Sequence, residues 1–191
     1  LAVVHLHGGH VPHEFDGYPE DAYLPGNQQV YTYPNNQDAS GIWYHDHALG
    51  ITRLNVYMGL AGLYLIRDEF EDSLNLPTCP DPGNPSTCFE VPLVMQDRKF
   101  NPDGTLFYPD LWQDHFFGDK MLVNGKVWPY LDVMQGKYRF RMYNGCNSRT
   151  LTVTLDRDDM AGPADMSFLQ IGTDGGFVEL PVTLNEITLG N

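Results

Sequence analysis

The stretch Lys137-Tyr138-Arg139-Phe140-Arg141-Met142-Tyr143 alternates aromatic or apolar side chains with cationic ones. Successive side chains of a β-strand point to opposite faces, so this alternation predicts a strand with one apolar and one charged face. The stretch from Thr150 to Leu155 alternates in the same way, with Leu151, Val153 and Leu155 on one side. Both patterns predict half-buried antiparallel strands.

Short segments of this kind recur along the chain, separated by turn signals rich in Pro, Asn, Asp and Gly. The further predicted strands are residues 2–7, 29–33, 42–47, 60–66, 91–96, 121–123, 167–171 and 185–189. Many short strands at this spacing predict an all-β fold, as a sandwich or Greek-key barrel. Residues 49–58 lack the alternation and predict a short helix or a wrapped loop, and residues 68–76 predict one helical turn.

Composition excludes several classes of function. The chain has 191 residues with 11 Lys and Arg against 25 Asp and Glu, a formal net charge of −14. This charge argues against a nucleic acid or an anionic membrane surface as partner. Hydrophobic residues make up 42% of the chain, so it is not a disordered tail. No stretch approaches the roughly 18 apolar residues that a spanning helix needs.

The cysteines leave two interpretations open. Cys79 and Cys88 bracket a stiff polar loop, which a disulfide would close in an exported protein and which would otherwise carry two free thiols. Cys146 stands alone in an Asn-Gly-Cys-Asn turn and is not expected to bind metal. Both ends of the chain read as strands, so we expect them to lie inside a longer protein.

Two His-x-His pairs, His5-Leu6-His7 and His45-Asp46-His47, lie on predicted strands. Residues i and i+2 of a strand face the same side, with Cα atoms about 6.6 Å apart. Two such strands side by side would present four imidazoles, which suit Zn, Cu, Fe or Ni. Chance placement of histidines is the alternative, but two pairs favour a transition-metal site whose metal the spacing does not identify.

The context of these pairs is more specific. Val4-His5-Leu6-His7-Gly8-Gly9 and Trp43-Tyr44-His45-Asp46-His47-Ala48 resemble the first two copper-binding motifs of the multicopper oxidases, in the branch of bacterial spore-coat laccases and bilirubin oxidases. The resemblance covers nearly the whole chain, and it extends over residues 15–20, 122–130, 137–141 and 170–176.

The resemblance implies cupredoxin-like Greek-key β-sandwich domains, of which the family has three. Residues 1–68 would be the C-terminal part of the first domain, carrying both His-x-His motifs. Residues 69–90 would be a Pro-rich connection, and residues 91–191 a truncated second domain.

A set of copper ligands also follows from the resemblance. It implies that His5 binds a type 2 copper and that His7, His45 and His47 bind a type 3 pair. In such a trinuclear centre O2 is reduced to water, while a small phenolic, tetrapyrrole or metal substrate is oxidised at a type 1 copper. The third domain supplies the type 1 site, the other four trinuclear ligands and a His-Cys-His motif that this sequence lacks. We therefore expect an oxidase fragment that is inactive alone; the alternative is a non-catalytic β-sandwich protein that binds copper or forms a coat.

Two acidic residues lie near these motifs. Asp16 matches an acidic residue close to the O2-reducing centre, where it would relay protons; otherwise it is an acidic turn residue beside Gly17. Asp46 lies between two ligands and so faces the opposite side of its strand, which predicts a hydrogen-bond partner rather than a ligand. The acidic balance and the possible disulfide lean towards export or a coat layer. The reducing substrate and the oligomeric state are not predicted.

Overall fold

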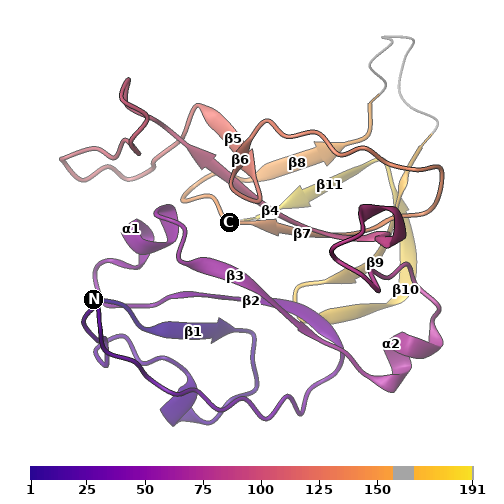
Figure 1. Ribbon diagram of the computed structural model, residues 1–191, viewed down its shortest axis with the longest axis horizontal. Helices are drawn as coiled ribbons and strands as arrows, with labels where there is room; N and C mark the ends of the chain where they lie inside the picture. Colours follow the sequence, from indigo (N-terminus) through magenta and orange to yellow (C-terminus); the bar gives the residue numbers. More distant parts are fainter. Residues whose placement is uncertain (157–165, 191) are drawn as a thin grey trace.

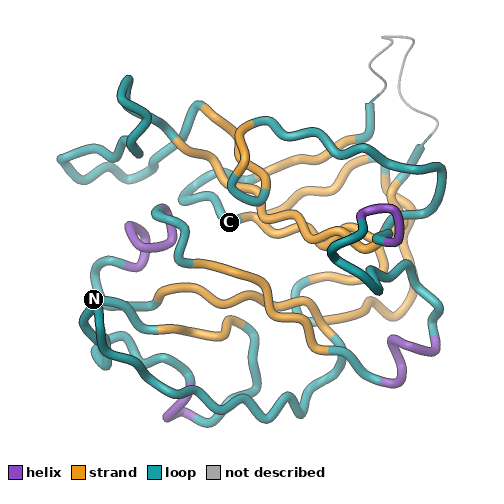
Figure 2. The backbone as a smooth tube through the Cα atoms, in the orientation of Figure 1, coloured by secondary structure: helices purple, strands orange, loops and turns teal. Residues whose placement is uncertain are grey.

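The computed structural model describes residues 1–156 and 166–190 and is built mostly of β-strands with a few short helices (Figures 1 and 2). The all-β prediction is confirmed. Residues 157–165 and 191 of the predicted second domain lie outside the described residues. None of the described helices is long and apolar enough to cross a membrane.

A three-stranded antiparallel sheet occupies the first third of the chain. It joins β1 (Val4–His7), β2 (Ser40–Asp46) and β3 (Ala61–Ile66) in that order. Leu6, Ile42 and Ile66 are buried together on one face and form its apolar core. Burial of one face fixes the register, because a slip of one residue would move these side chains to the other face.

The later strands form three sheets. The largest has the order β6-β5-β4-β7, and the others pair β10 with β9 and β11 with β8. In Figure 1 the four-stranded sheet lies above the sheet of β1, β2 and β3. The bounds are β4 Glu90–Arg98, β5 Lys120–Val123, β6 Lys126–Val127, β7 Arg139–Asn144, β8 Leu151–Thr154, β9 Phe168–Thr173, β10 Gly176–Leu184 and β11 Glu186–Leu189.

The helices are short and fall where the alternation fails. They are α1 (Thr52–Tyr57), α2 (Glu69–Ser73) and the 3-10 turns η1 (His13–Phe15) and η2 (Pro85–Thr87). The Asp68 carboxylate caps α2 by accepting a hydrogen bond from the backbone N–H of Glu71. An acidic cap stabilises a helix because it accepts from an otherwise unpaired N–H and its negative charge lies at the positive end of the helix dipole. The helical turn predicted within residues 68–76 is confirmed by α2.

Several features of the strands differ from the predictions. Residues 29–33 form no strand; their alternation reflects Tyr31, whose hydroxyl accepts from the Val4 N–H, and Tyr33, whose ring packs edge-on against Tyr64. β7 pairs parallel with β4, not antiparallel, because the intervening 40 residues form a crossover long enough for parallel pairing. β10 was not predicted, since it contains a proline and a register shift between Phe177 and Val182.

The charged face of β7 is also less exposed than its pattern suggests. Arg139 is buried and the Arg141 side chain is 9% exposed, and both meet two buried carboxylates, Glu71 of α2 and Glu90 of β4. Arg67, which follows β3, donates to both carboxylates, at 2.6 Å from Glu71 Oε1 and 2.7 Å from Glu90 Oε2. We call these five residues the ion cluster; it ties the end of the first sheet to the four-stranded sheet.

Close approach of the two sheets depends on Gly41 of β2. A Cβ atom there would overlap the hydroxyl of Tyr143 and crowd the Arg141 guanidinium, both from β7. Any larger residue would have to displace the ends of these two side chains.

Cys79 and Cys88 are joined by a disulfide, which decides between the two interpretations of this loop. Cys146 is free and buried, and it lies in no group of potential metal ligands among the described residues. Burial, together with the negative charge of Asp97, raises the pKa of its thiol to about 12. The division into residues 1–68, 69–90 and 91–191 stays a prediction.

Candidate metal centre

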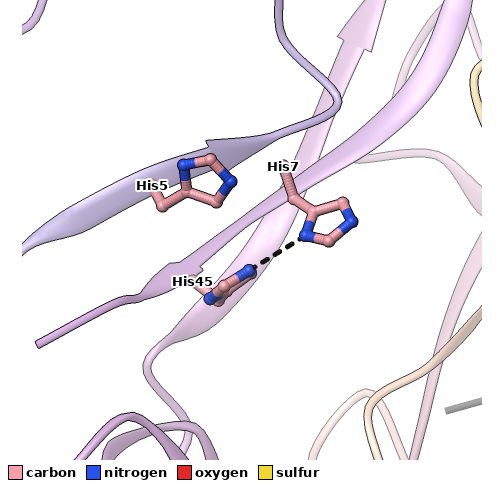
Figure 3. Close-up of side chains that lie close together, drawn as sticks. All are labelled: His5, His7 and His45. Atoms are coloured by element: carbon pink, nitrogen blue, oxygen red, sulfur yellow. Dashed lines mark hydrogen bonds between the residues drawn. The ribbon is translucent and has the colours of Figure 1, made fainter. Parts of the chain in front are cut away.

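The pairing of β1 with β2 brings the two His-x-His motifs together. His5 lies directly opposite His45, and His7 lies opposite Trp43. Directly opposed residues of an antiparallel pair share a face, so these four rings lie on the face away from the Leu6 core. Figure 3 shows His5, His7 and His45 converging from the two strands.

Three histidines offer ligand atoms to a common point. One ring nitrogen of each of His5, His7 and His45 lies within 4.8 Å of the other two. The shortest approach joins His7 Nδ1 to His45 Nε2, at 3.2 Å (Figure 3). Two ligands of one tetrahedral ion with bonds of about 2.0–2.1 Å lie about 3.3 Å apart, so this spacing fits a shared transition-metal ion.

Two of these rings are fixed by backbone carbonyls. His45 Nδ1 lies 2.8 Å from the carbonyl oxygen of Asp46, and His5 Nδ1 lies 2.7 Å from that of Asp16. A carbonyl only accepts, so each Nδ1 carries the proton and each Nε2 keeps its lone pair for a metal. The second contact depends on Gly17, whose φ is +82° and whose added Cβ would overlap the Val4 carbonyl.

The environment keeps His45 neutral. Burial lowers the pKa of its imidazole, and the neighbouring imidazoles of His5, His7 and His47 lower it further, against the opposing effect of the Asp46 carbonyl. A neutral imidazole is the metal-binding form. The imidazole of His45 is therefore in its metal-binding form at neutral pH.

His47 lies beside this group but outside it. β2 ends at Asp46, one residue before His47, so the predicted strand over residues 42–47 is one residue too long at this end. The His47 ring centroid is 4.9 Å from that of His5 and 6.0 Å from that of His45. Its Nδ1 is buried and has no hydrogen-bond partner among the described residues. An unpartnered ring nitrogen at this position suits a ligand that the protein itself does not supply.

Trp43 packs against the site. Its ring centroid lies 4.5 Å from that of His45 and 5.7 Å from that of His7. Trp43 therefore packs around the site. The sequence did not predict a role for Gly17, whose conformation lets the Asp16 carbonyl reach His5, or for Val3, whose N–H donates to the Asp46 carboxylate. The Asp-Gly pair at residues 16–17 was the only sequence signal for the role of Gly17.

Asp16 lies next to His5, as its predicted role requires. One carboxylate oxygen is 3.4 Å from His5 Nδ1, and the side chain is 53% exposed. The carboxylate therefore touches both a ring of the site and solvent. Asp46 lies on the opposite face of β2 and bonds backbone N–H groups, which confirms its predicted place as a hydrogen-bond partner.

Comparisons with known proteins agree with this site. Residues 2–71, which contain both histidine pairs, match the family model described as multicopper oxidase. The chain is 46% identical over 202 residues to a laccase of Bacillus stratosphericus, in an alignment covering 94% of the chain. The chain belongs to the multicopper oxidase family.

A bilirubin oxidase and a second multicopper oxidase are also similar to the chain. A bilirubin oxidase of Albifimbria verrucaria is 39% identical over 178 residues, covering 93% of the chain and 30% of that protein. The crystal structure of a variant of the McoA multicopper oxidase from Aquifex aeolicus superposes with a TM-score of 0.84 at 35% identity, over 99% of the chain and 40% of that structure. The chain spans 37% of the length of the Bacillus stratosphericus laccase.

Proposed function

We propose that this chain supplies part of the trinuclear copper centre of a laccase-like multicopper oxidase that reduces O2 to water. The observation that carries the proposal is the convergence of His5, His7 and His45, with His7 Nδ1 and His45 Nε2 3.2 Å apart. Family membership supports copper as the metal, because imidazole nitrogens alone would also accept zinc, iron or nickel.

The four histidines would divide the copper ions between them. His7 and His45 would share one ion through Nδ1 and Nε2, since these atoms already face each other. His5 would offer Nε2 to a second ion, with its Nδ1 held by Asp16. His47 would complete the set beside His5, which its unpartnered Nδ1 and the 4.9 Å ring spacing support.

Copper supplies one-electron redox chemistry, by which electrons from a reducing substrate reach O2. The residues of this chain would hold and orient the imidazoles and transfer protons towards the site. Asp16 would transfer protons from solvent towards the site, because its side chain is 53% exposed and its Oδ1 lies 3.4 Å from His5 Nδ1.

The reducing substrate would be a small phenolic, tetrapyrrole or metal compound. The names of the relatives, laccase and bilirubin oxidase, support this class. The disulfide between Cys79 and Cys88 supports export or a place in a coat, because such bonds persist in oxidising compartments. The activity would belong to the whole protein, with further polypeptide supplying the remaining copper ligands; the chain by itself would be inactive.

Oxygen consumption tests this proposal. We expect the copper-loaded whole protein to consume O2 in the presence of a phenolic substrate, and His45→Ala to lose at least a hundredfold in rate. His115→Ala is the matched control, because His115 is exposed and lies outside the cluster. Copper binding without O2 consumption would contradict the oxidase proposal and favour a non-catalytic copper-binding protein.

A further inference from the structure

Asp46 has an unusual set of contacts for a residue between two potential ligands. It is 3% exposed, and its side chain lies on the face of β2 opposite the imidazoles. Its carboxylate accepts from two backbone N–H groups, that of Val3 at 3.0 Å and that of Ala48 at 3.1 Å. Its own N–H donates to the Leu60 carbonyl at 3.1 Å. Its carbonyl accepts from His45 Nδ1 at 2.8 Å. All four polar atoms are thus engaged.

These contacts bracket both histidine motifs. Val3 lies two residues before His5, and Ala48 follows His47 directly. The His47 N–H also donates to the Val3 carbonyl at 2.9 Å, which closes a ring of backbone contacts around the carboxylate. The Asp46 side chain therefore sets how the start of β1 and the end of β2 lie relative to each other, while its carbonyl sets the tautomer of His45.

The charge of Asp46 is not explained by an ion pair. Among the described residues no Lys, Arg or His lies within ion-pair distance of its carboxylate. Burying a carboxylate costs several kcal/mol unless it is paired and hydrogen-bonded. A neutral Asn in its place would offer one acceptor oxygen and would direct an NH2 group at the other N–H. An anion on the face of β2 beneath an imidazole cluster would favour cations bound to that cluster.

We propose that Asp46 is a positioning residue for the copper ions, whose carboxylate holds the two His-x-His segments in register. The inference rests on the proposed copper function, but it concerns a residue that touches neither metal nor substrate. It predicts that the carboxylate acts on copper affinity through the backbone N–H groups of Val3 and Ala48.

The test compares Asp46→Asn with Asp38→Asn. Both variants remove one negative charge with little change of shape, and Asp38 is exposed. We expect copper affinity, measured by titration of the metal-free protein with copper, to fall 10- to 100-fold in Asp46→Asn, the range seen when residues supporting metal ligands are replaced. Asp38→Asn should remain within twofold of wild type. Equal affinities of the two variants, with wild type binding copper normally, would overturn the role of Asp46.

A second readout uses no metal. Nitrogen-15 NMR should show faster hydrogen exchange at the Val3 and Ala48 amides in Asp46→Asn than in Asp38→Asn, because only the first variant removes a partner of these N–H groups. If Asp46→Asn does not fold, wild type alone decides: Val3 and Ala48 amides that exchange as fast as those of an unfolded chain overturn the proposal, because the carboxylate would then not hold them. Failure of wild type to bind any copper would instead overturn the proposed function.

Discussion

Glu90→Gln is the substitution that most directly tests how the two sheets are held together. Glu90 is 5% exposed and accepts hydrogen bonds from Arg141 Nε at 2.6 Å and Arg67 Nη2 at 2.7 Å. Gln keeps the shape but removes the charge and one acceptor. Hydrogen bonds to charged groups contribute about 1.5–3 kcal/mol each, and removing one partner of a buried ion pair costs about 3–5 kcal/mol.

We therefore expect Glu90→Gln to lower the free energy of unfolding by about 3 kcal/mol at pH 7. In a domain of this size that corresponds to about 6–12 °C in Tm. Urea unfolding followed by tryptophan fluorescence measures the first, and circular dichroism on heating measures the second. Glu179→Gln is the control: Glu179 is exposed on β10, so the same chemical change there should cost less than about 0.5 kcal/mol.

The pH dependence gives a second check on the same residue. Burial alone would raise the pKa of Glu90, but hydrogen bonds and attraction from Arg67 and Arg141 outweigh it and hold the pKa below its ordinary value. A lowered folded pKa means that Glu90 stabilises the fold above its unfolded pKa, about 4.3, and that this stabilisation is lost as pH falls through the folded pKa. The gap between wild type and Glu90→Gln should be constant from pH 6 to 8 and should close in acid. A loss under 1 kcal/mol, or an equal gap at pH 3 and pH 7, would refute the reasoning.

Three further predictions concern packing and cysteine chemistry. Gly41→Ala should lower the free energy of unfolding by about 1–3 kcal/mol in urea, because its Cβ would overlap the Tyr143 hydroxyl. Adding Tyr143→Phe to the same chain should recover part of this loss. Losses that simply add in the double variant would contradict the contact. The Cys146 thiol is buried and its pKa is raised to about 12, so it should not react with a thiol reagent at pH 8 until urea unfolds the protein. Rapid reaction in the native state would show that the thiol is not buried. Replacing Cys79 and Cys88 together by Ser should lower the free energy of unfolding by about 2–3 kcal/mol, because the disulfide closes a loop with a sequence separation of 9 and so lowers the entropy of the unfolded chain. An unchanged urea midpoint would show that the disulfide contributes nothing to stability.

The sequence predicted the parts of the fold that depend on local pattern. Strict alternation at residues 151–154 predicted an antiparallel strand. The histidines of β1 and β2 lie together because burial of Leu6 and Ile42 on the other face fixes the register. Parallel pairing of β7 with β4 was missed because alternation does not reveal a strand's partner. Arg139 and Arg141 read as a polar face, and only the fold brings Glu71 and Glu90 to meet them.

The candidate site was predictable to a similar depth. Residue type and spacing were enough to select His5, His7 and His45, and parity along the strand placed Asp46 on the opposite face. The position of His47 was less predictable, since β2 ends one residue earlier and strand geometry no longer places its ring. The hydrogen bond from the Val3 N–H to the Asp46 carboxylate joins residues that are 43 positions apart in the sequence, and no local pattern predicts such a contact.

The most direct test of the copper site is an anomalous difference map at the copper absorption edge, from crystals of the copper-loaded protein. We predict a peak within about 2.0–2.1 Å of both His7 Nδ1 and His45 Nε2, and a second peak beside His5 Nε2. Peaks confined to other residues, or no peak at these nitrogens in crystals that contain copper, would contradict the proposal that these histidines hold the metal.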